Sequence, residues 1–120
     1  MLALLLTSVL LTSPIETIDG DTVEADGQRI RIANIDSPET RTAKCDAERR
    51  LGLVAKRRLA ELLGGGDILL TPGDPQDGRV TDMHGRVLAT LSVAGRDVGE
   101  ILIEEGLARP WAGRREPWCE

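Results

Sequence analysis

The chain has 120 residues, which is enough for one compact domain with a single core and too few for two. It contains no Phe and no Tyr, so the core must be built from aliphatic side chains. Acidic residues outnumber Lys plus Arg by 20 to 15, and the net charge of -5 argues against a protein that coats nucleic acid by broad phosphate neutralisation.

An apolar leader opens the chain. Residues 1–11 are nearly all apolar and precede a Thr-Ser-Pro sequence, which is typical of a secretory signal; a buried first strand is the alternative. The run is too short to span a bilayer. We therefore expect a signal segment at 1–13, one domain at 14–120, a secreted or periplasmic protein, and no stable membrane association after processing.

The region after the leader predicts strands at 14–18, 21–25 and 28–35. Asp-Gly pairs join these runs, and Asp-Gly between alternating β-branched segments is a strong hairpin signal. In the third strand Ile30 and Ile32 share one face. Arg31 therefore projects away from these two isoleucines.

A long helix is predicted at 46–63, ended by three consecutive glycines. Its apolar stripe consists of Ala47, Leu51, Val54, Ala55, Leu59, Leu62 and Leu63. The opposite face carries Arg49, Arg50, Lys56, Arg57 and Arg58. Such a basic face is more typical of a solvated surface than of a phosphate-binding one.

The second half of the chain predicts a strand at 67–71, a polar loop at 72–85, a strand at 86–93 and a helix at 98–105 that Gly106 ends. About five short strands with two helices favour a small closed barrel. We therefore expect an α+β, mainly β fold: an OB-fold five-stranded barrel with two or three packed helices.

Cys45 and Cys119 are the two cysteines of the chain. Neither has a neighbouring Cys or His at metal-ligand spacing, which argues against a zinc site. Export would favour a disulfide that ties the start of the long helix to the end of the chain. Two inert thiols are the alternative, and the sequence leaves both states open.

Three polar segments fall at predicted strand ends, at 18–22, 31–39 and 82–86. Each has an ordinary structural explanation. The Asp-Gly-Asp sequence is a hairpin turn, Ser37-Pro38-Glu39 resembles a helix start, and the last segment is a turn into a strand. His84, in that last turn, is assigned no catalytic role.

Together these segments supply one kind of chemistry. Asp21, Asp36 and Glu39 offer the hard carboxylate oxygens that calcium prefers. Arg31 and Arg86 offer guanidinium groups that can hold a phosphodiester bidentately and offset the charge that grows on it during attack.

In their order and spacing, these residues resemble the signature of the staphylococcal nuclease (thermonuclease) family. The resemblance is carried by Ile18-Asp19-Gly20-Asp21-Thr22, Arg31, Ile35-Asp36-Ser37-Pro38-Glu39, Asp82 and Gly85-Arg86. It runs from about Pro14 to Trp111 and includes 100–108, which is similar to the family's second helix and its exit. The fold that it implies is an OB-fold barrel with helices packed on it.

The resemblance implies a calcium-dependent nuclease. Asp21 and Asp36 would bind Ca²⁺ through their carboxylates, and Ser37 through its backbone carbonyl. Cleavage in this family breaks the bond to the 5′ oxygen and leaves 3′-phosphate ends. We therefore expect DNA and RNA as substrates of a monomeric enzyme.

The resemblance also implies three catalytic residues. Glu39 would orient or deprotonate the attacking water. Arg31 and Arg86 would contact the scissile phosphate, and Arg86 would also favour departure of the leaving oxygen. Relatives that have lost such residues act as nucleic-acid-binding or interaction modules, which is the alternative function, but the chain retains all of them.

The chain departs from the family pattern around the substrate. Met83 and His84 stand where the family often has Lys and Tyr, and no tyrosine follows the second helix. Trp111 offers a surface on which a base can stack, although a tryptophan that covers the end of the barrel is the favoured explanation.

Overall fold

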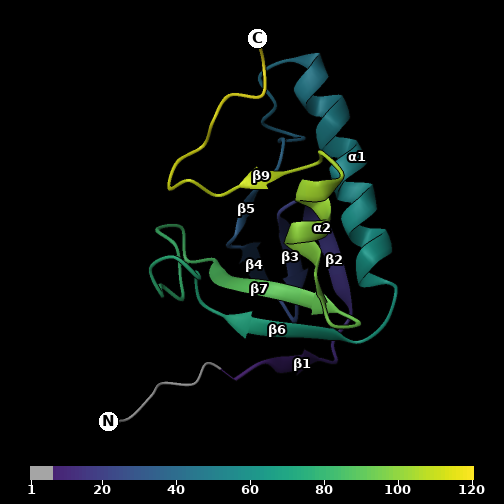
Figure 1. The fold of residues 1–120 in the computed structure, drawn as a ribbon, viewed down its shortest axis with the longest axis vertical. Coiled ribbons are helices and arrows are strands. Elements are labelled where there is room, and N and C mark those ends of the chain that lie inside the picture. The colour runs from purple at the N-terminus through teal and green to yellow at the C-terminus, as the bar shows by residue number, and fades with distance from the viewer. Residues whose placement is uncertain (1–6) are drawn as a thin grey trace.

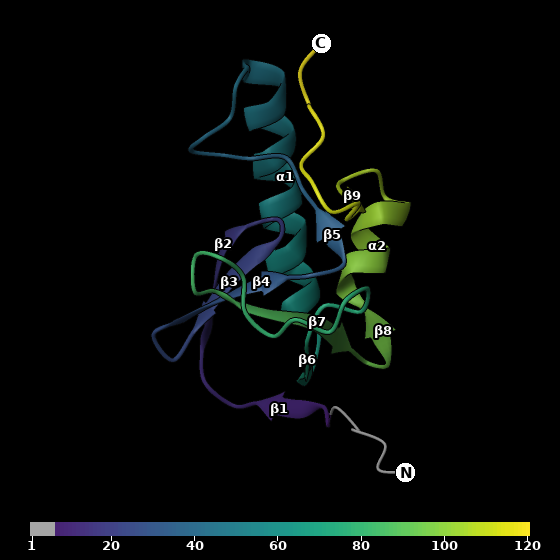
Figure 2. The same ribbon diagram turned by 90° about the vertical axis from the view of Figure 1, so that its left-hand side faces the viewer.

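The computed structural model describes residues 7–120, so residues 1–6 of the predicted signal segment lie outside the described part. Figure 1 shows a curled sheet with a long helix, α1 (Asp46–Leu63), on one side and a shorter helix, α2 (Val98–Glu104), beside it. The view turned by 90° shows the C-terminal segment alongside α1, at the opposite end of the molecule from the N-terminal strand (Figure 2).

The main sheet contains β1 (Val9–Leu11), β2 (Ile15–Asp19), β3 (Thr22–Ala25), β4 (Gln28–Ile32), β6 (Ile68–Pro72), β7 (Val87–Val93) and β8 (Arg96–Asp97). Its strand order is β1-β6-β7-β4-β3-β2, and β8 pairs with β7. Only β4 and β7 run parallel to each other. A separate pair joins β5 (Ile35–Asp36) to β9 (Arg109–Pro110).

The expected fold class is confirmed. The molecule is α+β and mainly β, with a sheet curled into a half-barrel and two helices within residues 7–120. The core lies between sheet and helices and is aliphatic, as the lack of Phe and Tyr requires. Its fully buried members include Val23, Ile32, Ile35, Leu59, Leu91, Val98 and Leu102.

The predicted third strand, at 28–35, is divided by a turn into β4 and β5. The alternative that Ser37-Pro38-Glu39 starts a helix is wrong, because α1 begins only at Asp46. The amide of Ser37 donates to the carboxylate of Asp21 at 3.1 Å, so this residue is tied to the β2–β3 turn instead of capping a helix.

Part of the predicted signal segment forms the edge strand β1, which pairs antiparallel with β6. Val9 and Leu10 in this strand are each about half exposed. Neither helix in the described part of the chain combines the length and apolar character needed to cross a membrane. Export stays a prediction.

The long helix has the predicted bounds, and Ala55, Leu59 and Leu63 of the predicted stripe are buried, but the rest of the buried face differs. Its buried residues are Glu48, Gly52, Ala55, Leu59 and Leu63. Val54, which was placed in the apolar stripe, is 49% exposed, and Ala47 is exposed as well. The predicted stripe leaves out Glu48 and Gly52, because neither side chain is apolar, although both residues face the interior.

Two glycines let α1 approach the polar segment that follows β5. A Cβ at Gly52 would lie 2.5 Å from the carbonyl oxygen of Glu39 and 2.9 Å from that of Pro38. A Cβ at Gly20 would lie 2.8 Å from the Cβ of Ala55 and 2.9 Å from Oγ of Ser37. The helix, the β2–β3 turn and this segment therefore pack in direct backbone contact.

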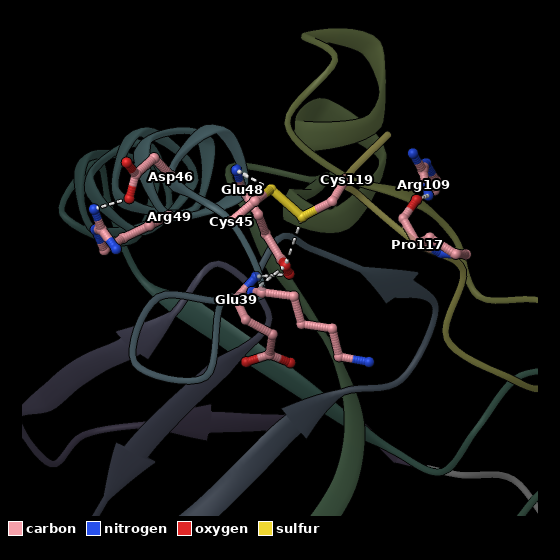
Figure 3. The surroundings of a disulfide bond; sticks show 9 residues. Glu39, Cys45, Asp46, Glu48, Arg49, Arg109, Pro117 and Cys119 are labelled. Atoms are coloured by element: carbon pink, nitrogen blue, oxygen red, sulfur yellow. Dashed lines mark hydrogen bonds and ion pairs between the residues drawn. A yellow bond between two sulfur atoms is a disulfide. The ribbon is translucent and has the colours of Figure 1, made fainter.

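Cys45 and Cys119 form a disulfide, the first of the two states that the sequence left open. Cys45 is also the N-cap of α1, where its Sγ accepts a hydrogen bond from the amide of Glu48 at 3.4 Å. The bond fastens the C-terminal segment to the start of α1 (Figure 3).

We expect Gly52→Ala to lower the free energy of unfolding by about 1–2 kcal/mol net. The added methyl group would clash with backbone atoms, which cannot rotate away as a side chain can. The cost of this overpacking exceeds the gain from the higher helix propensity of alanine. Urea denaturation measures the loss. Gly64→Ala is the matched control, because a Cβ at Gly64 makes only an ordinary contact of 3.5 Å. Equal stability of the two variants would show that α1 does not approach this segment so closely.

Replacing both cysteines with serine should lower the free energy of unfolding by about 4 kcal/mol in the chain-entropy description, because the bond closes a long loop. Thermal and urea unfolding of the double variant measure this loss. Wild-type protein in reductant should unfold like the double variant. A double variant as stable as the oxidised protein would mean that the bond contributes nothing in solution.

Candidate functional site

The predicted site residues come from separate elements that meet at one end of the sheet. Asp21 lies in the β2–β3 turn and Arg31 lies in β4. Asp36 belongs to β5, and Ser37 and Glu39 lie in the segment that leads to α1. Glu39 is partly exposed, whereas the other four are buried.

The guanidinium of Arg31 is buried and connects three segments of backbone. Its Nη1 donates to the carbonyl oxygens of Ile32 and of Ile35, the latter at 2.8 Å. Its Nη2 lies 3.6 Å from a carboxylate oxygen of Asp21. Burial lowers the pKa of Arg31 and the charge of Asp21 opposes this shift. An arginine keeps its charge in such a setting, so Arg31 contributes a fixed positive charge.

Asp21, Asp36 and Glu39, called the site carboxylates below, face a second arginine that the sequence did not reveal. Nη1 of Arg115 lies 2.7 Å from Oδ1 of Asp36 and 2.7 Å from Oε1 of Glu39. Burial raises the pKa of both Asp36 and Glu39, Arg115 opposes the rise, and Asp21 adds to it. The net rise means that the nearby arginines do not fully offset burial and the charge of Asp21.

Arg86 lies immediately before β7, where Asp82 holds it. One carboxylate oxygen of Asp82 accepts from Nε of Arg86 at 2.6 Å, and the other accepts from the amides of Arg86 and His84 at 2.9 Å. Burial of Asp82 opposes its charged form, but these hydrogen bonds and the charge of Arg86 lower its pKa. Asp82 is thus a positioning residue for Arg86, and it engages Nε and leaves the terminal amino groups free of this ion pair.

Arg31 and Arg86 line one cavity of about 360 Å³. Arg79, Arg115 and Trp111 line it as well, so four guanidinium groups share it with one indole. The guanidinium of Arg31 lies 5.3 Å from the centroid of the Trp111 ring, which is a cation–π contact. Arg31 and Arg115 contact the site carboxylates and also line the cavity. Asp74 and Asp82 also line the cavity, so its four arginines exceed its carboxylates by two, and it adjoins the site carboxylates.

The site carboxylates fit a divalent cation only after a local change. Within residues 7–120, no three His, Cys, Asp or Glu side chains are gathered closely enough to hold a metal ion as they stand. Yet Oδ2 of Asp36 and Oγ of Ser37 are buried and have no hydrogen-bond partner in this part of the chain. Nε1 of Trp118 is also buried and has no hydrogen-bond partner in the described residues. A hard cation would satisfy the unpaired carboxylate oxygen if Arg115 moved away from Asp36.

The structure thus brings the predicted residues into one region. Direct contacts link Arg31 to Asp21, and Asp21 to the amide of Ser37. Arg86 does not contact the site carboxylates but reaches the same cavity as Arg31. The individual roles of these residues stay predictions.

Sequence reasoning missed Glu48, a buried glutamate in the first turn of α1. Its carboxylate accepts from the amide of Glu39 at 3.0 Å and from that of Lys44 at 2.9 Å. In Figure 3 it lies beside the disulfide, while the Glu39 carboxylate points away from the sulfurs. A glutamate three residues after the N-cap Cys45 has the spacing of a capping box, which is the signal that would have identified it.

Sequence reasoning also missed Arg115, and here no local pattern identifies the residue. Its position follows from the disulfide, because Cys119 at the start of α1 draws the preceding residues toward the segment that carries Glu39. The sequence left the state of the two cysteines open, so it gave no basis for placing Arg115.

Comparisons with known proteins agree with this geometry. Residues 29–117 match the family described as Staphylococcal nuclease homologue. The chain is 38% identical over 96 residues to Endonuclease YncB of Bacillus subtilis (strain 168), covering 77% of this chain and 44% of that protein. It is 36% identical over 96 residues to SPbeta prophage-derived endonuclease YokF of the same organism, covering 77% of this chain and 31% of that protein. The chain therefore spans less than half the length of these relatives.

Glu48→Ala should lower the free energy of unfolding by about 1–3 kcal/mol, because the partly buried amides of Glu39 and Lys44 lose their charged acceptor. Glu48→Gln keeps one acceptor oxygen and should lose about half as much. Urea denaturation measures both changes, and hydrogen exchange at the amides of Glu39 and Lys44 should accelerate. Glu61→Ala, on the exposed face of the same helix, is the control and should change stability little. A loss no larger than that of the control would contradict this role.

Proposed function

Because the chain belongs to the staphylococcal nuclease family, we propose that this domain hydrolyses phosphodiester bonds of DNA and RNA, uses Ca²⁺, and leaves 3′-phosphate ends. The observation that carries the proposal is the cavity shared by Arg31 and Arg86, beside the site carboxylates. The printed names of the two relatives, both endonucleases, support nucleic acid as the substrate class.

Glu39 is the residue we assign to the proton of the attacking water. Burial raises its pKa, which brings this carboxylate closer to the range in which a general base works near neutral pH. The oxygen of the water forms a bond to phosphorus, its proton passes to Glu39, and the bond from phosphorus to the 5′ oxygen breaks. The products are a 3′-phosphate and a 5′-hydroxyl, which takes a proton from solvent.

Arg31 and Arg86 compensate the negative charge that grows on the phosphate oxygens during attack. Arg31 is pre-oriented, because its bonds to two carbonyl oxygens fix the plane of the guanidinium. Arg86 keeps its terminal amino groups for the phosphate, because Asp82 holds it through Nε. We assign to Arg86 the further role of stabilising the leaving 5′ oxygen.

The carboxylates of Asp21 and Asp36 and the carbonyl of Ser37 would hold the cation. When bound, the cation supplies positive charge next to the phosphate and lowers the pKa of water. Hard oxygen donors, the absence of Cys and His among these residues and the unpaired oxygen of Asp36 all favour Ca²⁺ over softer metals.

The substrate strand would enter the cavity with its phosphate on the arginines and a base against Trp111. Base stacking on an aromatic side chain is tolerant of sequence, which suits an enzyme that accepts both DNA and RNA. We further propose a monomer that works outside the cytoplasm. The disulfide supports that location, because such bonds persist in oxidising compartments.

Purified protein should degrade single-stranded DNA and RNA when calcium is added and stop when a chelator removes it. Glu39→Gln should lower kcat/KM by about 10²–10⁴-fold and Arg86→Gln by about 10²–10³-fold, since each removes one element of transition-state stabilisation. The same substitutions at an exposed ion pair, Glu104→Gln and Arg96→Gln, are matched controls and should leave the rate unchanged. Product ends that a polymerase extends only after phosphatase treatment would identify the 3′-phosphate.

The assay also separates the enzyme from the binding module. Binding of single-stranded DNA without cleavage at any calcium concentration would contradict the proposed enzyme and favour the binding module. Cleavage that continues in chelator would contradict the cation requirement.

A further inference from the structure

Arg115 holds two groups that the proposed reaction needs. One nitrogen, Nη1, contacts both the carboxylate of Asp36, proposed to bind the cation, and that of Glu39, proposed to accept the proton. A carboxylate oxygen that is paired with a guanidinium is not available to a metal ion. In the structure, Arg115 therefore occupies one oxygen of Asp36 and one of Glu39 that a cation or a water molecule would otherwise contact.

Arg115 belongs to residues 111–119, which we call the C-terminal strap. The strap is fastened at both ends to the walls of the site. At its start, the amide of Trp111 donates to the carbonyl of Asn34 at 3.0 Å, next to the β5–β9 pair. At its end, Cys119 is bonded to Cys45. The anchors keep Arg115 close to the site carboxylates even when its side chain moves.

A second contact fixes the end of the strap independently of Arg115. The guanidinium of Arg109 lies 3.7 Å from the centroid of the Trp118 ring. It also donates to the carbonyl oxygen of Pro117 at 2.9 Å. Loss of the Arg115 side chain should therefore leave the strap in place.

The Arg115 pairing is incomplete and open to solvent. The Arg115 side chain is 42% exposed, compared with 4% for Asp36 and 20% for Glu39. An ion pair with one exposed partner contributes less stability than a fully buried pair, although its loss leaves the buried carboxylate without a counter-charge. Asp36 moreover keeps one unpaired oxygen, which a single guanidinium nitrogen does not satisfy. A divalent ion carries twice the charge and takes several oxygens at once, so it is the stronger partner for this group.

The cavity can accommodate the guanidinium of Arg115 once it is displaced from Asp36. Arg115 already lines the cavity together with Arg31 and Arg86. After its release from Asp36, the guanidinium would still line the cavity in which the proposed substrate phosphate binds. Arginine is well suited to such an exchange, because the same fork that binds a carboxylate also binds a phosphate.

We propose that Arg115 is an exchangeable counter-cation, which pairs with Asp36 and Glu39 in the ion-free protein, gives way to a divalent cation, and then faces phosphate in the cavity. This inference rests on the proposed function, because it takes Ca²⁺ as the resident ion. The exchange lets the acidic site fold without metal, and it makes ion binding weaker than the carboxylates alone would allow.

Calorimetric titration with calcium tests the competition directly. Arg115→Gln should bind calcium about five-fold more tightly than the wild type, since the ion no longer displaces a paired guanidinium. Arg114→Gln is the matched control, because Arg114 is 80% exposed, pairs with Glu116 and contacts none of the site carboxylates. Its affinity for calcium should equal that of the wild type.

Thermal unfolding supplies a second measurement that does not depend on activity. Without calcium, Arg115→Gln should melt below the wild type, because its buried carboxylates lose their counter-cation. At saturating calcium the difference should vanish, because the ion replaces Arg115 in both proteins. If the glutamine variant folds poorly, Arg115→Lys, which keeps the charge but not the fork, should shift both measurements in the same directions by less.

Tryptophan fluorescence follows the strap itself. Trp111 and Trp118 are the two tryptophans of a chain without Tyr or Phe, and both lie in the strap. Calcium should change the emission of the wild type and of Arg114→Gln more than that of Arg115→Gln. Equal or weaker calcium binding by Arg115→Gln would overturn the inference and leave the proposed function standing. Failure of the wild type to bind calcium would overturn the proposed function, and the inference with it.

Discussion

One buried guanidinium organises the whole site. Arg31 carries a positive charge into the interior, where it bonds to the carbonyls of Ile32 and Ile35 and pairs with Asp21. These contacts hold the turn between β4 and β5 against the β2–β3 turn. The guanidinium of Arg31, which also faces the cavity, therefore fixes the relative positions of the segments that carry Asp21 and Asp36. Removal of this charge would leave Asp21 buried and unpaired, which is far more costly than the loss of one exposed ion pair.

The distribution of charge makes an acidic protein compatible with the anionic substrate that we propose. The chain as a whole carries a net charge of -5, yet four guanidinium groups line one cavity. The net charge would repel a polyanion at long range, whereas the arginines of that cavity would attract it, and screening by salt matters less there than at an open surface. Recognition then depends on a few placed arginines and not on a broad basic face.

Features that depend on residues close together in the sequence can be predicted from it, whereas those that depend on distant residues cannot. The bounds of α1 follow from local periodicity and a glycine stop, and they agree with the structure. Its buried face follows only in part: Ala55, Leu59 and Leu63 are buried as periodicity predicts, whereas Glu48 and Gly52 turn inward to meet the backbone of a distant segment. The convergence of Asp21 and Arg31 follows from their places at neighbouring strand ends. Arg115 depends on a covalent bond between residues 74 positions apart, and no local pattern encodes it.

The edge strand β1 has a consequence for maturation. Its three residues cover the free edge of β6, and they lie within the segment that resembles a secretory signal. A peptidase that cut at the end of that segment would remove β1 and leave the backbone groups of residues 68–70 without their outer partner. Such a cut, which export through the expected signal would require, would thus create an open sheet edge that can accept a strand from another chain.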